Sequence, residues 1–254
     1  YRHLAQQIQE SLHFIEALGI NSENTPQLRQ VQYFTSHEAL LLPFEEAMTR
    51  VDSTSGDVYD TSAHFLWIGN RTRSLDNAHV EFCRGIQNPI GIKCGPSVDL
   101  DQLIRLLDTL NPNNVGGKIT LINRFGCEGV GKYLQPLVQK VKEEGRSVVW
   151  SCDPMHGNTI KGSNGKKTRS FDQILEEVKM SLQIHSSEDS HLGGIHLEMT
   201  GQDVTECTGG LDDISENDLT QRYRTHCDPR LNANQAIELA FLIADELKRN
   251  GHGH

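Results

Sequence analysis

Residues 89–124 read PIGIKCGPSVDLDQLIRLLDTLNPNNVGGKITLINR and decide the fold. The apolar runs Ile90–Cys94 and Ile119–Asn123 have the length and composition of buried strands. Between them, the stretch 99–110 is amphipathic and long enough for a helix. Two strands joined through a helix are typical of a parallel sheet. We therefore expect a β-α-β unit here.

The same alternation extends through the rest of the chain. Further strands are predicted at Val31–Ser36, Phe65–Gly69, Val148–Cys152 and Gly194–Met199, and further helices at 37–50, 75–86, 132–145, 170–184 and 232–249. A first helix is predicted from the spacing of Leu4, Ile8, Leu12, Ile15 and Leu18. Strict alternation with nearly continuous apolar strands indicates an α/β fold, in which helices cover a parallel sheet.

Two architectures fit this pattern, a doubly wound sheet and a (β/α)8 TIM barrel. The barrel is favoured because polar or charged residues end nearly every strand on one side, where barrel enzymes build their active sites. Only six strands are predicted, whereas a closed barrel needs eight. We therefore expect one incomplete TIM-barrel domain over residues 1–254, with the first two strands located before Tyr1.

The net charge and the amino-acid composition limit which classes of molecule the protein can bind. The formal net charge of -10 argues against nucleic-acid or anionic-membrane binding. No stretch approaches the roughly 20 apolar residues of a membrane span. The six cysteines form no CxxC pair, which predicts reduced and mostly buried thiols. An acidic protein can still bind small anionic molecules, because cationic pockets can exist locally inside it.

Three motifs place an imidazole or a carboxylate where an apolar run gives way to a loop. They are Asp153–Thr159 (DPMHGNT), Gly194–Gly201 (GIHLEMTG) and Thr225–Asn232 (THCDPRLN), and they carry His156, Glu198 and Asp228. Imidazole and carboxylate groups are common ligands of divalent metals. A single acid at a strand end is usually a cap or a surface charge. The prediction of one shared metal site therefore depends on all three residues together.

Three cationic residues, Arg71, Lys93 and Arg124, also follow strand-like runs. A buried ammonium or guanidinium group needs an anionic partner, and a structural ion pair could explain any one of them. Three on the same face would form a clamp for phosphate or carboxylate. Beside a divalent metal, such a clamp suits a phosphorylated, carboxylated small molecule.

One motif suggests a different class of site. Residues 126–132, GCEGVGK, fit the nucleotide-binding pattern GxxxxGK between a strand and a helix. The next residue is Tyr133 in place of the Ser or Thr that binds Mg²⁺, and Glu128 would repel phosphate. We therefore expect a glycine-rich turn and no nucleotide site. The stretch Gly162–Gly165 is expected to form a mobile loop over the active site.

Several motifs together resemble one known family. They are Ser36–Leu40 (SHEAL), Trp67–Arg73 (WIGNRTR), Asp153–Thr159, Thr205–Gly210 (TECTGG) and Cys227–Asn232. The chain resembles class II 3-deoxy-D-arabino-heptulosonate 7-phosphate (DAHP) synthase, the plant and actinobacterial type. The resemblance covers essentially all 254 residues, as the C-terminal part of a longer family protein.

The resemblance implies a metal-dependent transferase that condenses phosphoenolpyruvate (PEP) with erythrose 4-phosphate, the entry to the shikimate pathway and aromatic amino acid biosynthesis. It implies that His156, Glu198 and Asp228 bind the metal, with Mn²⁺ or Co²⁺ expected ahead of Zn²⁺ or Fe²⁺. Among the substrate-binding residues it implies Asn70, Arg71, Lys93 and Arg124, with Lys93 and His156 also catalytic. It further implies a homo-oligomer, located in the cytoplasm or, in a plant, in the plastid stroma.

The chain departs from the family pattern in two respects. The family's fourth metal ligand, a Cys, and another PEP-binding Arg belong to the two strands expected before Tyr1. In addition, Asn70 stands where the family has Glu. Two alternatives therefore stay open. One is a non-catalytic or subunit-dependent relative that binds PEP. The other is a variant enzyme that makes an amino-substituted sugar acid or supplies phenazine synthesis.

Overall fold

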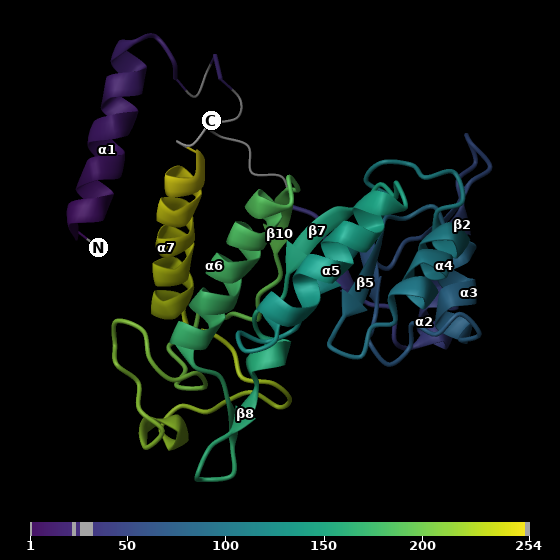
Figure 1. The fold of residues 1–254 in the computed structure, drawn as a ribbon. Helices are drawn as coiled ribbons and strands as arrows, with labels where there is room; N and C mark the ends of the chain where they lie inside the picture. Colours follow the sequence, from purple (N-terminus) through teal and green to yellow (C-terminus); the bar gives the residue numbers. More distant parts are fainter. Residues whose placement is uncertain (1, 22–23, 26–32, 252–254) are drawn as a thin grey trace. The chain divides into compact units, whose positions relative to one another are not determined.

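The computed structural model describes residues 2–21, 24–25 and 33–251 (Figure 1). The chain divides into two compact units, Tyr1–Thr35 and Ser36–His254. The first unit contains helix α1 (Arg2–Ala17), which confirms the first predicted helix. A single domain over residues 1–254 stays a prediction.

The second unit is built on a six-stranded parallel sheet. Its strands are β1 (Ser36–Glu38), β4 (Phe65–Ile68), β5 (Ile90–Cys94), β6 (Ile119–Asn123), β7 (Val149–Cys152) and β10 (Leu192–Ile195). Their spatial order is β1-β4-β5-β6-β7-β10, so each strand lies beside the one before it in sequence. In a doubly wound sheet, the spatial order of the strands would reverse at a switch point. The sequential order is consistent with a barrel-type sheet, and closure into a barrel stays a prediction.

Helices follow the strands and pack against one another in sequence order (Figure 1). They are α2 (Leu42–Met48), α3 (Ala78–Arg84), α4 (Leu100–Leu110), α5 (Val130–Glu143), α6 (Phe171–Ser187) and α7 (Ala233–Gly251). Helix α3 contacts α4, α4 contacts α5, α5 contacts α6, and α6 contacts α7. In the described part of the chain, no helix has the length and apolar character needed to cross a membrane.

Three predicted elements have different bounds in the structure. The helix predicted at 37–50 spans only Leu42–Met48, because Pro43 favours the first turn of a helix and Ser36–Glu38 instead pairs with β4. After this helix, β2 (Thr49–Val51) pairs with β3 (Val58–Asp60). Part of the strand predicted at Val31–Ser36 lies outside the described residues. The strand predicted at Gly194–Met199 is β10, which ends at Ile195.

Strand alternation gives the central sheet two different faces. Leu66, Ile92 and Leu121 belong to the buried core on the helix side. On the opposite face, a side chain at Gly91 would place its Cβ 2.8 Å from Phe65 Cζ and 2.9 Å from both Trp67 Cβ and Ile122 Cδ1. Glycine is therefore required at this position. Because side chains alternate along a strand, Lys93 lies on the same face as Gly91, away from the helix layer.

The stretch Gly162–Gly165, expected to be a mobile loop, is the turn of a β-hairpin formed by β8 (Ile160–Lys161) and β9 (Lys167–Thr168). The backbone N–H of Gly162 donates to the carbonyl of Lys166 at 2.9 Å. At the tip, Ser163 donates from both its backbone N–H and its hydroxyl to Glu216 Oε2, at 3.1 and 2.7 Å. The hairpin tip is thus bound to a distant loop of the same unit.

The cysteines agree with the prediction of reduced, mostly buried thiols. All six are free of disulfides, and Cys83, Cys94, Cys152 and Cys207 are buried. Burial raises the pKa of the Cys83, Cys94 and Cys207 thiols to about 12. Thiols with raised pKa values are poor nucleophiles, so these groups serve packing.

His185 on α6 predicts a pH dependence of folding. It is 1% exposed, packs against Trp150 with ring centroids 5.2 Å apart, and shares a 3.0 Å hydrogen bond between Nδ1 and the Ser190 hydroxyl. Burial, with a smaller effect from the charge of His191, lowers the pKa of His185 to about 4. The pKa of an unfolded histidine is near 6.5, so between about pH 6.5 and 4 the unfolded chain binds a proton that folded His185 does not. The contribution of His185 to the free energy of unfolding is therefore complete above about pH 6.5 and is lost as the pH falls towards 4.

We expect the free energy of unfolding to fall by about 2 kcal/mol more in the wild type than in His185→Gln when the pH is lowered from 7 to 5. Urea titrations at both pH values measure the difference. Parallel losses in the two proteins would contradict the assignment.

Candidate metal and anion site

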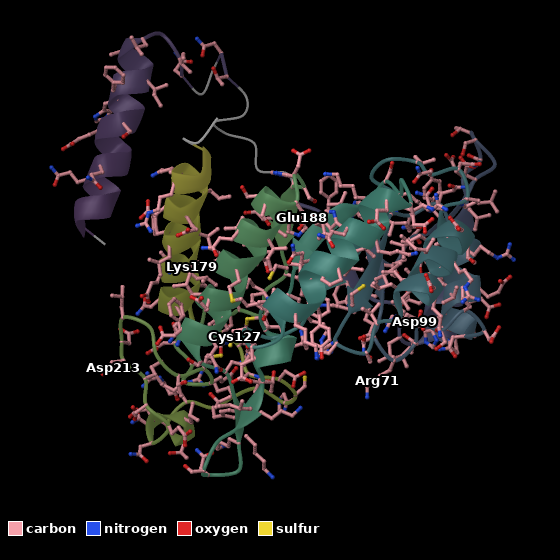
Figure 2. All side chains as sticks on the ribbon, in the orientation of Figure 1. Arg71, Asp99, Cys127, Lys179, Glu188 and Asp213 are labelled. Carbon is pink, nitrogen blue, oxygen red and sulfur yellow. The ribbon has the colours of Figure 1, made fainter. Side chains whose placement is uncertain are left out.

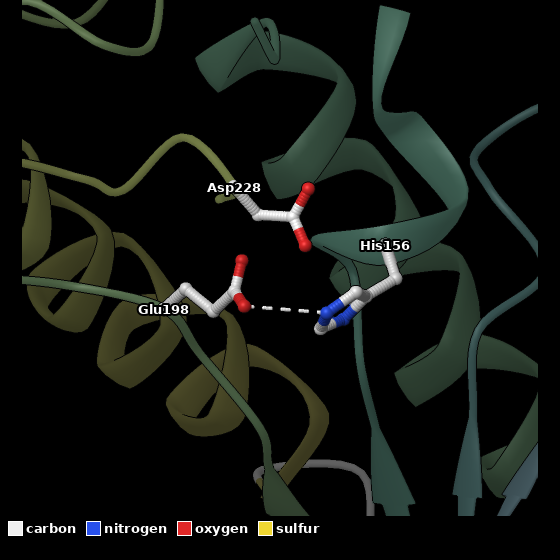
Figure 3. A group of neighbouring side chains, drawn as sticks. All are labelled: His156, Glu198 and Asp228. Atoms are coloured by element: carbon white, nitrogen blue, oxygen red, sulfur yellow. Dashed lines mark ion pairs between the residues drawn. The ribbon is translucent and has the colours of Figure 1, made fainter. Parts of the chain in front are cut away.

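His156, Glu198 and Asp228 meet at one point although they are far apart in sequence. His156 lies in the 3₁₀ turn η2 (His156–Asn158) after β7, Glu198 follows β10, and Asp228 lies in the loop before α7. One ligand atom from each lies within 4.8 Å of those of the other two (Figure 3). The structure therefore brings together the three residues that the sequence motifs singled out.

The ring of His156 is held from both sides. Its Nδ1 lies 2.7 Å from Oδ2 and 3.0 Å from Oδ1 of Asp153, and its Nε2 lies 3.3 Å from Oε1 of Glu198. A carboxylate on one ring nitrogen fixes the tautomer and leaves the other nitrogen available to a metal. Burial lowers the pKa of His156, but hydrogen bonds to Asp153 and Glu198 outweigh it and raise the pKa to about 9.

Asp153 connects the histidine to the predicted cationic residues. Its side chain is 0% exposed and accepts a 2.5 Å hydrogen bond from Lys93 Nζ. Oδ1 also accepts the backbone N–H groups of Met155 and His156, each at 3.1 Å. Burial acts to raise the pKa of Asp153, but the His156 hydrogen bond and the Lys93 charge hold it well below its ordinary value. Asp153 therefore stays ionised and links both halves of the site.

Each ligand carboxylate is paired with a cation. Glu198 Oε2 accepts a hydrogen bond from the buried guanidinium of Arg169, and Asp228 Oδ1 lies 2.9 Å from Lys167 Nζ. Burial acts to raise the pKa of Glu198, but His156 and Arg169 outweigh it and lower the pKa to about 2. One imidazole and two carboxylates form a donor set that suits Mn²⁺, Fe²⁺, Co²⁺ or Zn²⁺. The residues present therefore fit a possible divalent-metal site.

Lys93 and Arg124 lie beside this cluster. Lys93 is 5% exposed, and its Nζ lies 5.6 Å from the ring centroid of Trp67. Burial lowers the pKa of Lys93, against the opposing effect of Asp153. Arg124 Nη2 donates to the carbonyl of His156 at 3.3 Å. Arg124 therefore contacts the segment that carries His156 directly, and Lys93 contacts it through Asp153.

Asn70 lies next to Arg124 around Gly95. A Cβ at Gly95 would lie 3.1 Å from Arg124 Nη1 and 3.3 Å from Asn70 Oδ1. Asn70 Oδ1 accepts hydrogen bonds from the Gly95 N–H at 3.2 Å and from Arg73 Nε at 3.3 Å. Asn70 thus fixes the chain after β5 at Gly95, a residue that Arg124 also approaches closely.

Arg71 is placed differently from the other cations. It is exposed after β4, and Figure 2 shows its side chain extending away from the ribbon. By contrast, Arg124 lies near enough to Lys93 for its charge to lower the pKa of that lysine. The structure groups two of the three predicted cations, and a role for Arg71 in substrate binding stays a prediction.

The glycine-rich segment 126–132 is a turn that leads into helix α5, and the N–H groups at the start of the turn are occupied. Glu177 Oε1 accepts the N–H of Phe125 at 3.1 Å and of Gly126 at 2.9 Å, and Asn158 Oδ1 accepts the N–H of Cys127 at 2.9 Å. A nucleotide-binding loop needs such groups free to bind phosphate. Gly157 packs so closely that its Cβ would lie 2.3 Å from Gly126 N. The turn therefore supports the segment that carries His156.

Sequence reasoning missed three residues of the site. Asp153 begins the motif DPMHGNT but is given no role of its own from the sequence, although its spacing from His156 is a usable signal. His196 packs edge-on against Trp67, with ring centroids 5.0 Å apart. Burial, together with the Lys93 charge, lowers the pKa of His196 to about 4. Its position two residues before Glu198 could have placed both on one face of an extended chain. Arg169 carries no comparable local signal.

Comparisons with known proteins show the family of the chain. The family model described as the class-II DAHP synthetase family matches residues 1–244, and the chain belongs to this family. It is 49% identical to the phospho-2-dehydro-3-deoxyheptonate aldolase of Streptomyces coelicolor and 49% identical to that of Neurospora crassa, over 96% and 98% of the chain. A Mycolicibacterium smegmatis enzyme of the same name is 48% identical over 98%. The chain spans about half of these relatives, 54%, 55% and 54% of their lengths.

We expect Asp153→Asn to destabilise the protein by about 3–5 kcal/mol, because it leaves the buried Lys93 ammonium without a counter-charge. The matched change Asp228→Asn removes a carboxylate whose Lys167 partner is exposed, and it should alter the free energy of unfolding by less than about 1 kcal/mol. Denaturant titrations of both variants test this. Equal effects would contradict the role of Asp153.

Proposed function

We propose that this chain supplies the metal-binding and PEP-binding part of a DAHP synthase, a transferase that condenses PEP with erythrose 4-phosphate. The observation that supports this most directly is the meeting of His156, Glu198 and Asp228 beside a buried lysine. The family membership and the similarity to enzymes of that name add to it.

In this proposal, Lys93 and Arg124 bind the phosphate and carboxylate of PEP. Lys93 lies on the sheet face opposite the helix layer, and Arg124 reaches the backbone of the His156 turn. Fixed cations stabilise the negative charge that spreads over the reacting PEP and the departing phosphate. Asn70 fixes the chain after β5 by accepting the Gly95 N–H, and Arg71 would contribute from the end of β4.

His156, Glu198 and Asp228 would hold the divalent cation, with Mn²⁺ or Co²⁺ preferred and Zn²⁺ or Fe²⁺ also compatible with the donor set. When bound, this cation supplies a Lewis acid that polarises the aldehyde of erythrose 4-phosphate for attack by C3 of PEP. The Asp153 carboxylate accepts the proton on Nδ1 of His156, so Nε2 would be the ligand atom once a bound cation displaces the proton that Nε2 shares with Glu198. The same carboxylate keeps the Lys93 ammonium charged.

The activity is proposed for the longer protein. The chain spans about half the length of the relatives it matches, and the family resemblance implies a Cys ligand and a second PEP-binding Arg in addition to the residues named here. In the part of the chain that the structure describes, no cysteine joins the cluster of three ligands. Assembly into a homo-oligomer stays a prediction.

We expect the longer protein to consume PEP in an erythrose 4-phosphate-dependent reaction that chelator abolishes and Mn²⁺ or Co²⁺ restores. His156→Ala should weaken metal binding by at least about 100-fold and reduce turnover accordingly, because it removes the only nitrogen ligand of the cluster. His79→Ala, which removes a histidine bonded to the Leu40 carbonyl, is the control. Full turnover in chelator, or by His156→Ala without added metal, would contradict the proposal.

One observation favours the alternative of a PEP-binding relative without activity of its own, namely the neutral Asn70 where the family has Glu. We expect Asn70 to be compatible with turnover, because Oδ1 supplies the acceptor that Gly95 and Arg73 need. Calorimetry with PEP, followed by an assay of the same sample with both substrates and Mn²⁺, separates the two. Tight PEP binding without turnover in the longer protein would favour the alternative.

A further inference from the structure

Arg169 is a fully buried cation next to the proposed metal ligands. It follows β9 and precedes Ser170, the N-cap of α6. Its side chain is 0% exposed. Its backbone carbonyl accepts the Thr208 N–H at 2.9 Å, which fixes the start of the side chain. A buried arginine loses its hydration, so the groups around it must compensate for that loss.

The guanidinium contacts all three segments that carry a proposed ligand. Nε donates to the hydroxyl of Thr159 at 2.8 Å, three residues after His156. Nη1 donates to Oε2 of Glu198 itself and, at 2.5 Å, to the carbonyl of Pro229, the neighbour of Asp228. Nη2 has no partner in the described part of the chain. The compensation for burial therefore comes from these three contacts.

The contact with Glu198 also selects one of its oxygens. Arg169 binds Oε2, and Oε1 remains directed at His156, 3.3 Å from Nε2. A guanidinium is a rigid planar fork, so it sets the orientation of the groups that it joins. Glu198 is thereby prepared to offer a single oxygen, Oε1, towards the point where the three ligand residues meet.

We propose that Arg169 is a positioning residue that sets the spacing of His156, Glu198 and Asp228 and makes Glu198 a one-oxygen ligand. This inference rests on the metal site of the proposed function. It does not require that the bound metal support the condensation reaction. Groups that orient metal ligands in this way typically change metal affinity by about 10- to 100-fold when they are replaced.

The test measures Mn²⁺ binding to the longer protein without substrates, from the electron paramagnetic resonance signal of free Mn²⁺. Arg169→Lys keeps the positive charge but loses the planar guanidinium with its several N–H donors. We expect this variant to raise the Kd for Mn²⁺ by about 10- to 100-fold. Arg169→Gln should weaken binding further. Thr159→Val, which removes the Nε acceptor together with the 3.2 Å hydrogen bond from the Thr159 hydroxyl to the Met155 carbonyl, should weaken it several-fold. Arg146→Lys, which alters a distant pair with Asp108, is the matched control and should bind as the wild type does.

Thermal unfolding followed by circular dichroism shows whether each variant is folded. A folded Arg169→Lys protein with wild-type Mn²⁺ affinity would overturn the proposal, as would equal weakening in Arg146→Lys. If Arg169→Lys does not fold, the Mn²⁺ affinity of Thr159→Val tests the proposal in its place. Wild-type affinity in Thr159→Val would then overturn the proposal. Wild-type protein that binds Mn²⁺ but forms no product contradicts the proposed enzyme alone. Wild-type protein that binds no Mn²⁺ contradicts both.

Discussion

The buried carboxylate of Asp153 is the interaction on which the site depends. An ionised group with no exposed surface must be compensated by nearby cations or N–H donors. Asp153 has both, because Lys93 lies at 2.5 Å, His156 at 2.7 Å, and two backbone N–H groups point at Oδ1. One residue therefore joins β5, which carries Lys93, to the turn after β7. The geometry of the metal-site histidine and the charge of the buried lysine are consequences of the same contact.

A second buried carboxylate supports this turn from the helix side. Glu177 on α6 accepts N–H groups from the turn after β6 through Oε1, and its Oε2 accepts a 2.7 Å hydrogen bond from Asn158. Burial raises the pKa of Glu177 to about 7, while the hydrogen bonds from the turn act to lower it. The turn bearing His156 is thus held between a helix and a neighbouring strand end. Its position does not depend on the sheet alone.

Sequence analysis predicted the central strands well because runs such as Ile90–Cys94 are mostly apolar and bounded by turn residues. It was wrong about the start of the helix predicted at 37–50, because Ser36–Glu38 pairs with Phe65–Trp67, a long-range contact that outweighs the local helical pattern. His156 and Glu198 could be predicted because a polar group after an apolar run is visible in the sequence. The burial of Arg169 was not visible, because it results from three loops meeting. The outward course of Arg71 depends on the turn after Gly69, which has no apolar pattern.

The sequential order of the strands has a consequence for how the chain acquires its structure. Each strand-helix unit packs chiefly on its immediate predecessor, so order can spread in the direction of synthesis, with loop closures that stay short. The final loop is different, because Asp228 must reach a cluster whose other members lie on earlier units. The proposed cation site would therefore be completed late, and an intermediate that stops before this loop closes would have most of its hydrophobic core but lack Asp228 at the cluster.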